Sequence, residues 1–297
     1  MEVKFKYSQH VDLVFHVLAH MRVNNASNLF SAEYIEKIEE EKCAGDLDLA
    51  REIKPLEPYY NRNFERLAMI NFLPLNSRGL NELKQILLNY DGFNKDDFKA
   101  FINPFTDLLE REAAFYYDYW EKQHKALGGR RSVVESQMER LLKDYQCIFD
   151  YFQKSALVYF SLSITRNGRG FSGIENYFSA VVPFPAQERD FQGAFFTLLH
   201  EYTHQFTDQL LKAEINMEDG SHDLSENIVM LFDYYLIKSV YSADIKAYID
   251  WFAKISGNDG AGISEAEFLA MVSVPEDIKK NMLDLLDSDG MRKASEY

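Results

Sequence analysis

The chain has 297 residues and a formal net charge of −15, with apolar and charged fractions typical of ordinary globular proteins. This charge argues against nucleic acid or a membrane as the main partner, because nucleic acids and anionic membranes attract clustered Lys and Arg side chains. The sequence has no apolar run long enough to cross a bilayer and no signal-peptide segment at its N-terminus. Cys43 and Cys147 are interpreted as free thiols. These features predict a cytoplasmic protein of unknown oligomeric state.

The first 128 residues are predicted to be mainly helical. A short strand over residues 2–8 precedes apolar residues at helical spacing from His10 to Arg22. Further helices are expected at 31–41, 63–73, 79–90 and 95–126. The pair Gly128-Gly129 predicts a helix stop. We therefore divide the chain into an N-terminal helical region, 1–128, and a catalytic region, 129–297.

The catalytic region is predicted to begin with a helix over 131–154 and to continue with two strand-like runs. Ala156–Ile164 is rich in β-branched and aromatic residues, and Tyr177–Val182 follows the turn signal Asn167-Gly168. Further helices are expected at about 189–213, 224–240, 243–255, 264–271 and 276–287. The expected fold is α+β and predominantly helical, with a small β-sheet preceding the two helices that carry the candidate site.

The segment His200-Glu201-Tyr202-Thr203-His204 lies within the helix expected over 189–213 and has the pattern H-E-x-x-H. Residues four apart lie on one face of a helix, so His200 and His204 can direct two imidazoles at one metal ion. Glu201 lies beside them, where it can hold and deprotonate a metal-bound water. This pattern predicts a catalytic Zn²⁺ site, which needs three protein ligands and an open position.

The third ligand is expected from the next helix, 224–240. Glu226 lies early in that helix and can reach the first helix if the two pack antiparallel. His222 and Asp223 are competing ligands. Here the sequence resembles the gluzincin metallopeptidases, in which a Glu on the helix after H-E-x-x-H completes the site. The resemblance implies a zinc metallopeptidase with a gluzincin-like catalytic core.

A second resemblance precedes the zinc helix. The segment Ser172-Gly173-Ile174-Glu175-Asn176 is similar to the G-x-M-E-N segment of the aminopeptidase-N type of gluzincin, with Ser in place of the first Gly and Ile in place of Met. In that family the segment lies on an edge strand. The resemblance implies that Glu175 binds the substrate's α-amino group, with Asn176 beside it, and that the strand pairs with the peptide backbone. The alternative is a hairpin Glu with no such role.

The chain also departs from these families. The aminopeptidase-N spacing would place the third ligand at Asp223, and the thermolysin type has an Asp where this chain has Met230. Asp233 or Asp223 is therefore the candidate carboxylate that orients a zinc-bound histidine. The candidate for stabilising the developing oxyanion is Tyr241. Further candidates for that role are His222, Tyr234 and Tyr235.

Two other patterns are weaker. His16 and His20 are also four apart on a helix, with His10 upstream, but no Glu adjoins them, and they are interpreted as packed or surface histidines. The loop Gly257–Gly262 lacks the acidic spacing of a calcium site. The prediction is therefore one Zn²⁺ site that hydrolyses a peptide or protein substrate, with Glu201 as general base. The alternatives are a regulatory or other zinc hydrolase acting on a specific partner, and a non-catalytic binding module that retains the metal.

Overall fold

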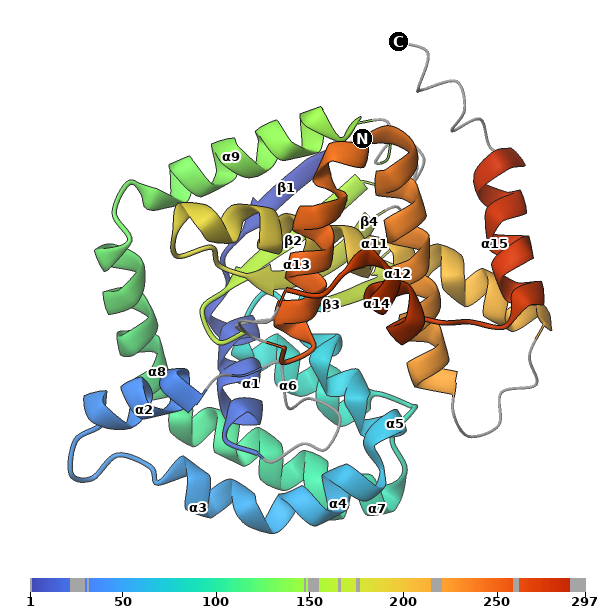
Figure 1. Cartoon of the computed structure of the whole chain (residues 1–297). Helices are drawn as coiled ribbons and strands as arrows, with labels where there is room; N and C mark the ends of the chain where they lie inside the picture. The colour runs from blue at the N-terminus through green and yellow to red at the C-terminus, as the bar shows by residue number, and fades with distance from the viewer. Residues whose placement is uncertain are drawn as a thin grey trace.

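The computed structural model describes residues 2–21, 30, 32–146, 148, 155–164, 167–174, 177–214, 221–258 and 262–288. It is mostly helical and contains a small four-stranded mixed sheet, which confirms the predicted α+β class (Figure 1). Within these ranges, none of the helices combines the length and the apolar character that a bilayer-spanning segment requires. Cys43 is an exposed free thiol, and Cys147 lies outside the described residues.

The sheet has the order β1-β2-β4-β3. Its strands are β1 (Val3–Lys6), β2 (Ser155–Ser161), β3 (Arg169–Ile174) and β4 (Tyr177–Pro183). β1, β2 and β4 are parallel, and β3 runs antiparallel to β4 at one edge. The expected strands near 2–8, 156–164 and 177–182 are therefore present. β3 was not predicted separately, because two of its six residues are glycines and Ile174 is its single β-branched residue.

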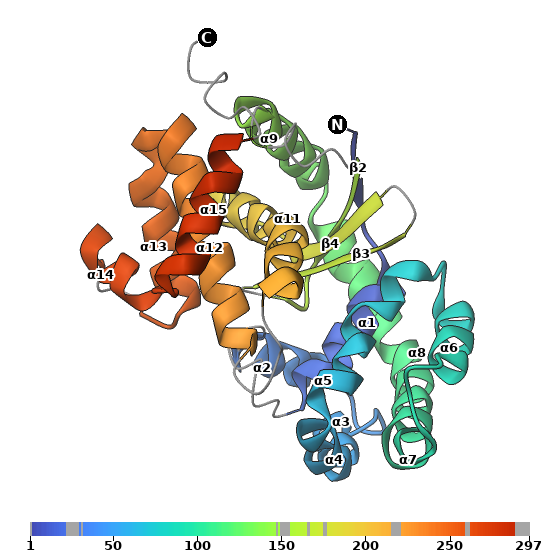
Figure 2. The ribbon, with the colours of Figure 1, turned by 90° about the vertical axis from the view of Figure 1, so that its right-hand side faces the viewer.

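The sheet is buried on both faces. On β2, Ala156, Val158 and Phe160 belong to the cluster formed with the C-terminal helices, whereas Tyr159 packs into the cluster of the N-terminal helices. On β4, Val181 likewise faces the N-terminal cluster. Successive side chains of a strand point to opposite faces, so these parallel strands need apolar residues at nearly every position. The result is a central sheet between two helical layers (Figure 2).

The N-terminal layer consists of the helices of the first 126 residues. They are α1 (Gln9–Ala19), α2 (Ala32–Glu41), α3 (Leu49–Ile53), α4 (Glu57–Arg62), α5 (Phe64–Leu67), α6 (Leu80–Asn89), α7 (Lys95–Asp97) and α8 (Asn103–Ala126). The helix predicted over 95–126 is continuous but contains a π-helical stretch, Phe98–Ile102, directly before Pro104. Proline lacks the N–H that would continue the i−4 hydrogen bonds, which accounts for this local change. Gly128 has a φ of +50°, as the predicted helix stop requires.

The C-terminal layer carries the predicted H-E-x-x-H helix. Its helices are α9 (Arg130–Asp144), α11 (Phe191–Glu214), α12 (Ser221–Val240), α13 (Ile245–Ile255), α14 (Glu265–Met271) and α15 (Glu276–Ser288). α11 packs against β4 and β3 on one side and α12 on the other (Figure 2). The two hydrophobic clusters follow the predicted boundary at residue 128 apart from the strands, and β1 joins the sheet of the second region. The division into two domains stays a prediction.

Candidate metal centre

His200 and His204 lie one helical turn apart on α11, on the side that faces α12. α11 begins after Pro183 and Pro185, where Gln187 and Asp190 form a reciprocal capping box. The two imidazole Nε2 atoms are 3.3 Å apart, and the ring centroids are 4.8 Å apart. His200 is buried and His204 is partly exposed. The helix therefore directs the two imidazole Nε2 atoms toward one point, and this point is accessible on the side of His204.

Glu226 on α12 completes a group of three donors. One of its carboxylate oxygens lies 3.2 Å from His200 Nε2, and the other lies 3.5 Å from His204 Nε2. A tetrahedral zinc with ligand bonds of 2.0–2.2 Å holds its ligand atoms roughly 3.3–3.6 Å apart. The two contacts use different oxygens of Glu226, and one donor atom from each of the three side chains lies within 4.8 Å of the others, so small side-chain movements would bring them to that spacing. Within the described ranges, this is the one group of three or more His, Cys, Asp or Glu side chains arranged to hold a metal ion.

Asp233, two turns after Glu226 on α12, lies behind His200. Its Oδ2 is 3.9 Å from His200 Nδ1, and both atoms are buried without a hydrogen-bond partner among the described residues. The hydroxyl of Thr203 donates to the other oxygen of Asp233 at 2.5 Å. Metal-binding histidines usually donate their second N–H to such a carboxylate. Of the two orienting candidates, the structure thus places Asp233 beside the site, whereas Asp223 is exposed.

The electrostatics of this group favour a bound cation. Burial lowers the pKa of His200, but the carboxylates of Glu226, Glu201 and Asp233 outweigh burial and raise it to about 9. Burial raises the pKa of Asp233 to about 7, against the opposing effects of His200 and Thr203. Several acidic groups therefore share one proton-binding imidazole. A divalent cation would take the place of that proton and satisfy the same carboxylates.

Glu201 projects from α11 toward the edge strand β3 and is 7% exposed. Burial raises the pKa of its carboxyl group to about 7, although His200, Arg169 and a backbone hydrogen bond from Gly170 act in the opposite direction. A Cβ on Gly170 would lie 2.9 Å from Glu201 Oε2 and 2.5 Å from Phe178. Only a residue without a side chain allows the strand to approach this closely. The carboxyl group therefore lies between the metal centre and β3.

The structure does not bring Tyr241 to this centre. Tyr241 follows the C-terminal end of α12, about 22 Å along the helix axis from Glu226 at 1.5 Å per residue. Its ring stacks on Tyr145, with centroids 4.3 Å apart. Tyr234 contacts Lys238 and Glu265 instead. Its neighbour Tyr235 contacts the Tyr234 ring edge to face, with ring centroids 5.2 Å apart. Tyr241 is therefore not among the residues that the structure brings to the centre, and its oxyanion-stabilising role stays a prediction.

Some predicted residues fall outside the description. Glu175 and Asn176 lie outside the described residues, and so does the side chain of His222. The strand that leads to Glu175, β3, is described and lies at the edge of the sheet, as the aminopeptidase-N resemblance implies. Whether Glu175 faces the metal centre stays a prediction.

Sequence reasoning missed four residues around the centre. Gly168 and Gly170 bring β3 against α11, Arg169 acts electrostatically on Glu201, and the Trp251 ring lies 6.1 Å from the His200 ring. Two glycines two positions apart, at the start of the strand that precedes β4 and α11, were an available signal for a close backbone approach. Nothing in the pattern of α13 distinguishes Trp251 from an ordinary core aromatic.

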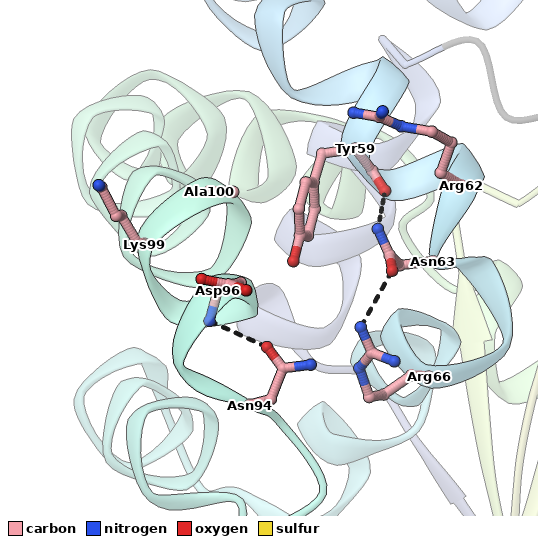
Figure 3. A pocket seen from close by; sticks show the side chains of 8 residues that line it. All are labelled: Tyr59, Arg62, Asn63, Arg66, Asn94, Asp96, Lys99 and Ala100. Carbon is pink, nitrogen blue, oxygen red and sulfur yellow. Dashed lines mark hydrogen bonds between the residues drawn. The ribbon is translucent and has the colours of Figure 1, made fainter.

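A separate surface cavity of about 660 Å³ lies in the N-terminal layer between α4, α5 and the start of the 95–126 helix (Figure 3). Its cations include Arg62 and Arg66. Arg66 is already bound by Asp97, through contacts of 2.6 and 2.8 Å. Asp96 adds a negative charge at the same opening. This balance of charges gives the cavity no clear ligand preference, and it is not part of the metal centre.

Comparisons with known proteins provide no assignment: no family model, no curated protein and no solved structure matches this chain.

Proposed function

We propose that this chain is a zinc-dependent hydrolase that cleaves peptide bonds. The observation that carries the proposal is the convergence of His200, His204 and Glu226, whose donor atoms lie within 4.8 Å of one another, a spacing that small side-chain movements would bring to that of a tetrahedral zinc. When bound, a zinc ion would supply Lewis-acid activation of water and of the substrate carbonyl. His200, His204 and Glu226 would hold it, and Asp233 would fix the orientation of the His200 ring.

Glu201 is the residue suited to move the proton. Its carboxyl group is buried next to the donor group, and its pKa of about 7 lies near the operating range that general acid–base catalysis favours. In the proposed reaction, a carboxylate oxygen of Glu201 accepts a proton from the attacking water and then delivers it to the leaving amine. The adjacent backbone of Gly170 holds this carboxylate in place through its hydrogen bond.

The position of β3 supports a peptide as substrate. β3 forms the edge of the described sheet and contacts Glu201 through Gly170. An edge strand offers backbone N–H and C=O groups to which an extended peptide can add as a further strand. A peptide bound in this way would pass alongside the catalytic carboxyl group. Removal of N-terminal residues would additionally require Glu175 to bind the α-amino group.

The test is digestion of a proteome-derived peptide library by the zinc-loaded protein, with mass spectrometry of the products. We expect hydrolysis by the wild type and a loss of roughly 100-fold to 10,000-fold in Glu201→Gln, because a general acid–base residue contributes that much. Zinc content should be unchanged. Glu188→Gln is the matched control, since Glu188 is exposed just before α11, and it should retain full activity.

The products also separate the alternatives. Release of single N-terminal residues supports an aminopeptidase, and internal cuts support an endopeptidase. Bound zinc without cleavage of any library peptide would contradict the proposal. That result would favour the non-catalytic binding module, or a hydrolase restricted to one partner protein. Full activity in Glu201→Gln would refute the role of this residue.

A further inference from the structure

A cavity of about 1050 Å³ lies beside the N-terminal half of α11. The ends of the parallel strands β2 and β4 form its floor, and α13 forms one wall. Gln123 and Leu127 of α8, together with Lys37 of α2, lie on the opposite side. Crevices at the carboxyl ends of parallel strands are frequent ligand sites. The cavity therefore lies between the N-terminal and C-terminal layers of the molecule.

The cavity lies along the face of α11 that leads toward the metal centre. Gly193 and Thr197 line it, and Glu201 follows Thr197 by one helical turn on the same face. A Cβ on Gly168 would lie 2.8 Å from Thr197 Cγ2 and 3.0 Å from Glu201 Cγ, so the two side chains lie against the same point of the chain. Trp251 lines the cavity too, and its ring centroid is 6.1 Å from that of His200.

The lining combines large apolar side chains with charged ones. Its large side chains include Leu162, Ile164, Phe184, Phe196, Trp251 and Ile255. The charged side chains of the lining are Glu33, Lys37, Arg189, Asp190, Asp250 and Lys254, and most of them have polar or charged partners. Asp190 lies 4.0 Å from both Arg189 and Lys254, and Lys37 donates to Gln123 at 2.9 Å. A charged ligand would have to compete with these contacts, whereas an apolar group gains by leaving water.

We propose that this cavity binds a large apolar or aromatic side chain of the substrate, from a residue next to the bond that is cut. This inference rests on the proposed function, because it assigns the specificity of the same centre. A pocket of this size accepts more than one side chain, so neighbouring substrate residues also enter it. Gly193 has no side chain, and this leaves volume in the cavity beside α11. The large substrate side chain would occupy that volume.

Gly193 provides the means of testing the cavity. A Cβ at this position would meet only Trp251 Cδ1, at an ordinary contact distance of 3.5 Å. Alanine is therefore tolerated, and it is the better helix former. Leucine would project further and reduce the volume beside Thr197. Ala247→Leu, on the α13 wall, fills the cavity from the other side without touching α11.

The experiment measures binding to the zinc-loaded wild type by calorimetry. The probes are the N-acetylated hydroxamic acids of phenylalanine and alanine, which share a zinc-binding group and differ by one phenyl ring. We expect the phenylalanine probe to bind about tenfold to hundredfold more tightly. In Gly193→Leu and Ala247→Leu this preference should disappear, while the Kd of the alanine probe changes less than about twofold. Gly193→Ala should retain most of the preference.

Equal affinity of the two probes for the wild type would overturn the inference. So would an unchanged preference in both leucine variants, provided that their thermal unfolding shows folded proteins. A protein that prefers the phenylalanine probe but cleaves no peptide would refute the proposed function and leave the cavity assignment intact. Peptide cleavage without any preference for apolar residues near the cut would refute the cavity assignment and leave the proposed function intact.

Discussion

Two histidine pairs in this molecule have nearly the same internal geometry. His16 and His20 on α1 have ring centroids 4.8 Å apart and an interplanar angle of 78°. His200 and His204 on α11 have the same separation and an angle of 82°. Each pair also has a glutamate within contact distance of an imidazole nitrogen: Glu112 lies 2.8 Å from His16, and Glu226 lies 3.2 Å from His200.

The pairs differ in where their nitrogen atoms point. His16 is saturated, with Nδ1 at Tyr34 and Nε2 at Glu112, and His20 Nδ1 bonds the backbone oxygen of His16. Lys42 also contacts Glu112, at 3.0 Å. In the second pair, both Nε2 atoms and the Glu226 carboxylate converge. Lys42 thus supplies in the first cluster the positive charge that a metal would supply in the second.

His16 and His200 also differ in the direction of their pKa shifts. Burial, His20 and Lys42 hold the pKa of His16 well below its ordinary value. The pKa of His200 rises to about 9 because three carboxylates outweigh its burial. Histidines four apart on a helix are therefore not sufficient for a metal site. The direction of the nitrogen atoms and the charge already present decide the outcome.

The largest expected difference follows removal of one histidine from each pair. His200→Ala should lower zinc affinity by more than the roughly 100-fold that loss of an outer partner causes, and hydrolysis should disappear with the metal. His16→Ala should leave zinc content unchanged and lower stability instead. Metal analysis after dialysis measures the first effect, and urea unfolding measures the second. Zinc loss in His16→Ala would show that the first histidine pair also takes part in metal binding.

Replacement of the internal cation tests the first cluster. Lys42→Met leaves the fully buried Glu112 carboxylate without its cation, and breaking a buried ion pair costs about 3–5 kcal/mol. Lys37→Met, at an exposed position on the preceding helix, should change the unfolding free energy by less than about 1 kcal/mol. Urea unfolding of both variants gives the values. Equal effects would show that Lys42 does not stabilise the cluster.

The outer carboxylate of the metal centre should have a smaller effect. Asp233→Asn keeps the shape of the side chain but weakens its hold on His200 Nδ1. Zinc affinity should fall by roughly 10-fold to 100-fold. Asp223→Asn, on the exposed part of the same helix, is the matched control and should bind zinc as the wild type does. Competition with a chromophoric chelator measures both. A larger effect at Asp223 would reverse the assignment of the two residues.

Zinc affinity should depend on pH. Because the pKa of metal-free His200 is about 9, this imidazole carries a proton at pH 7 that the metal must displace. Affinity should therefore rise about tenfold per pH unit between pH 6 and 8. Calorimetry in buffers of different ionisation enthalpy should detect at least one proton released per zinc at pH 7, since Glu201 and Asp233, with pKa values of about 7, can release further protons. Release of no proton at that pH would contradict this account of the site's charge.

The smallest effect is expected at the contact between β3 and α11. Gly170→Ala places a methyl group against Phe178 and Glu201. The overpacking should cost about 1–3 kcal/mol of stability and lower hydrolysis without removing zinc. Gly262→Ala, where a Cβ would meet no atom within 4 Å, should have neither effect. Wild-type activity and stability in Gly170→Ala would show that β3 does not hold Glu201.

The sequence predicted most helices because their apolar spacing is long and regular, as in α11 and α12. It missed α3 and α4, which are only five and six residues long and are separated by the 3-10 turn Lys54–Leu56, which contains Pro55. The three candidate metal ligands were predicted from helical spacing and the length of one connection. Asp233 was one of the two candidates for the carboxylate that orients a zinc-bound histidine, because it lies two turns after Glu226 on the same predicted helix. Trp251 and the contact of β3 with Glu201 depend on tertiary packing, which spacing along the chain does not specify.

The central claim is that His200, His204 and Glu226 together bind zinc. The most direct measurement is anomalous X-ray diffraction at the zinc absorption edge from crystals of the zinc-loaded protein. We predict one anomalous peak about 2.0–2.2 Å from a ring nitrogen of each histidine and from a carboxylate oxygen of Glu226. A peak elsewhere, such as beside His16 and Glu112, or no peak at the α11–α12 contact, would contradict the claim.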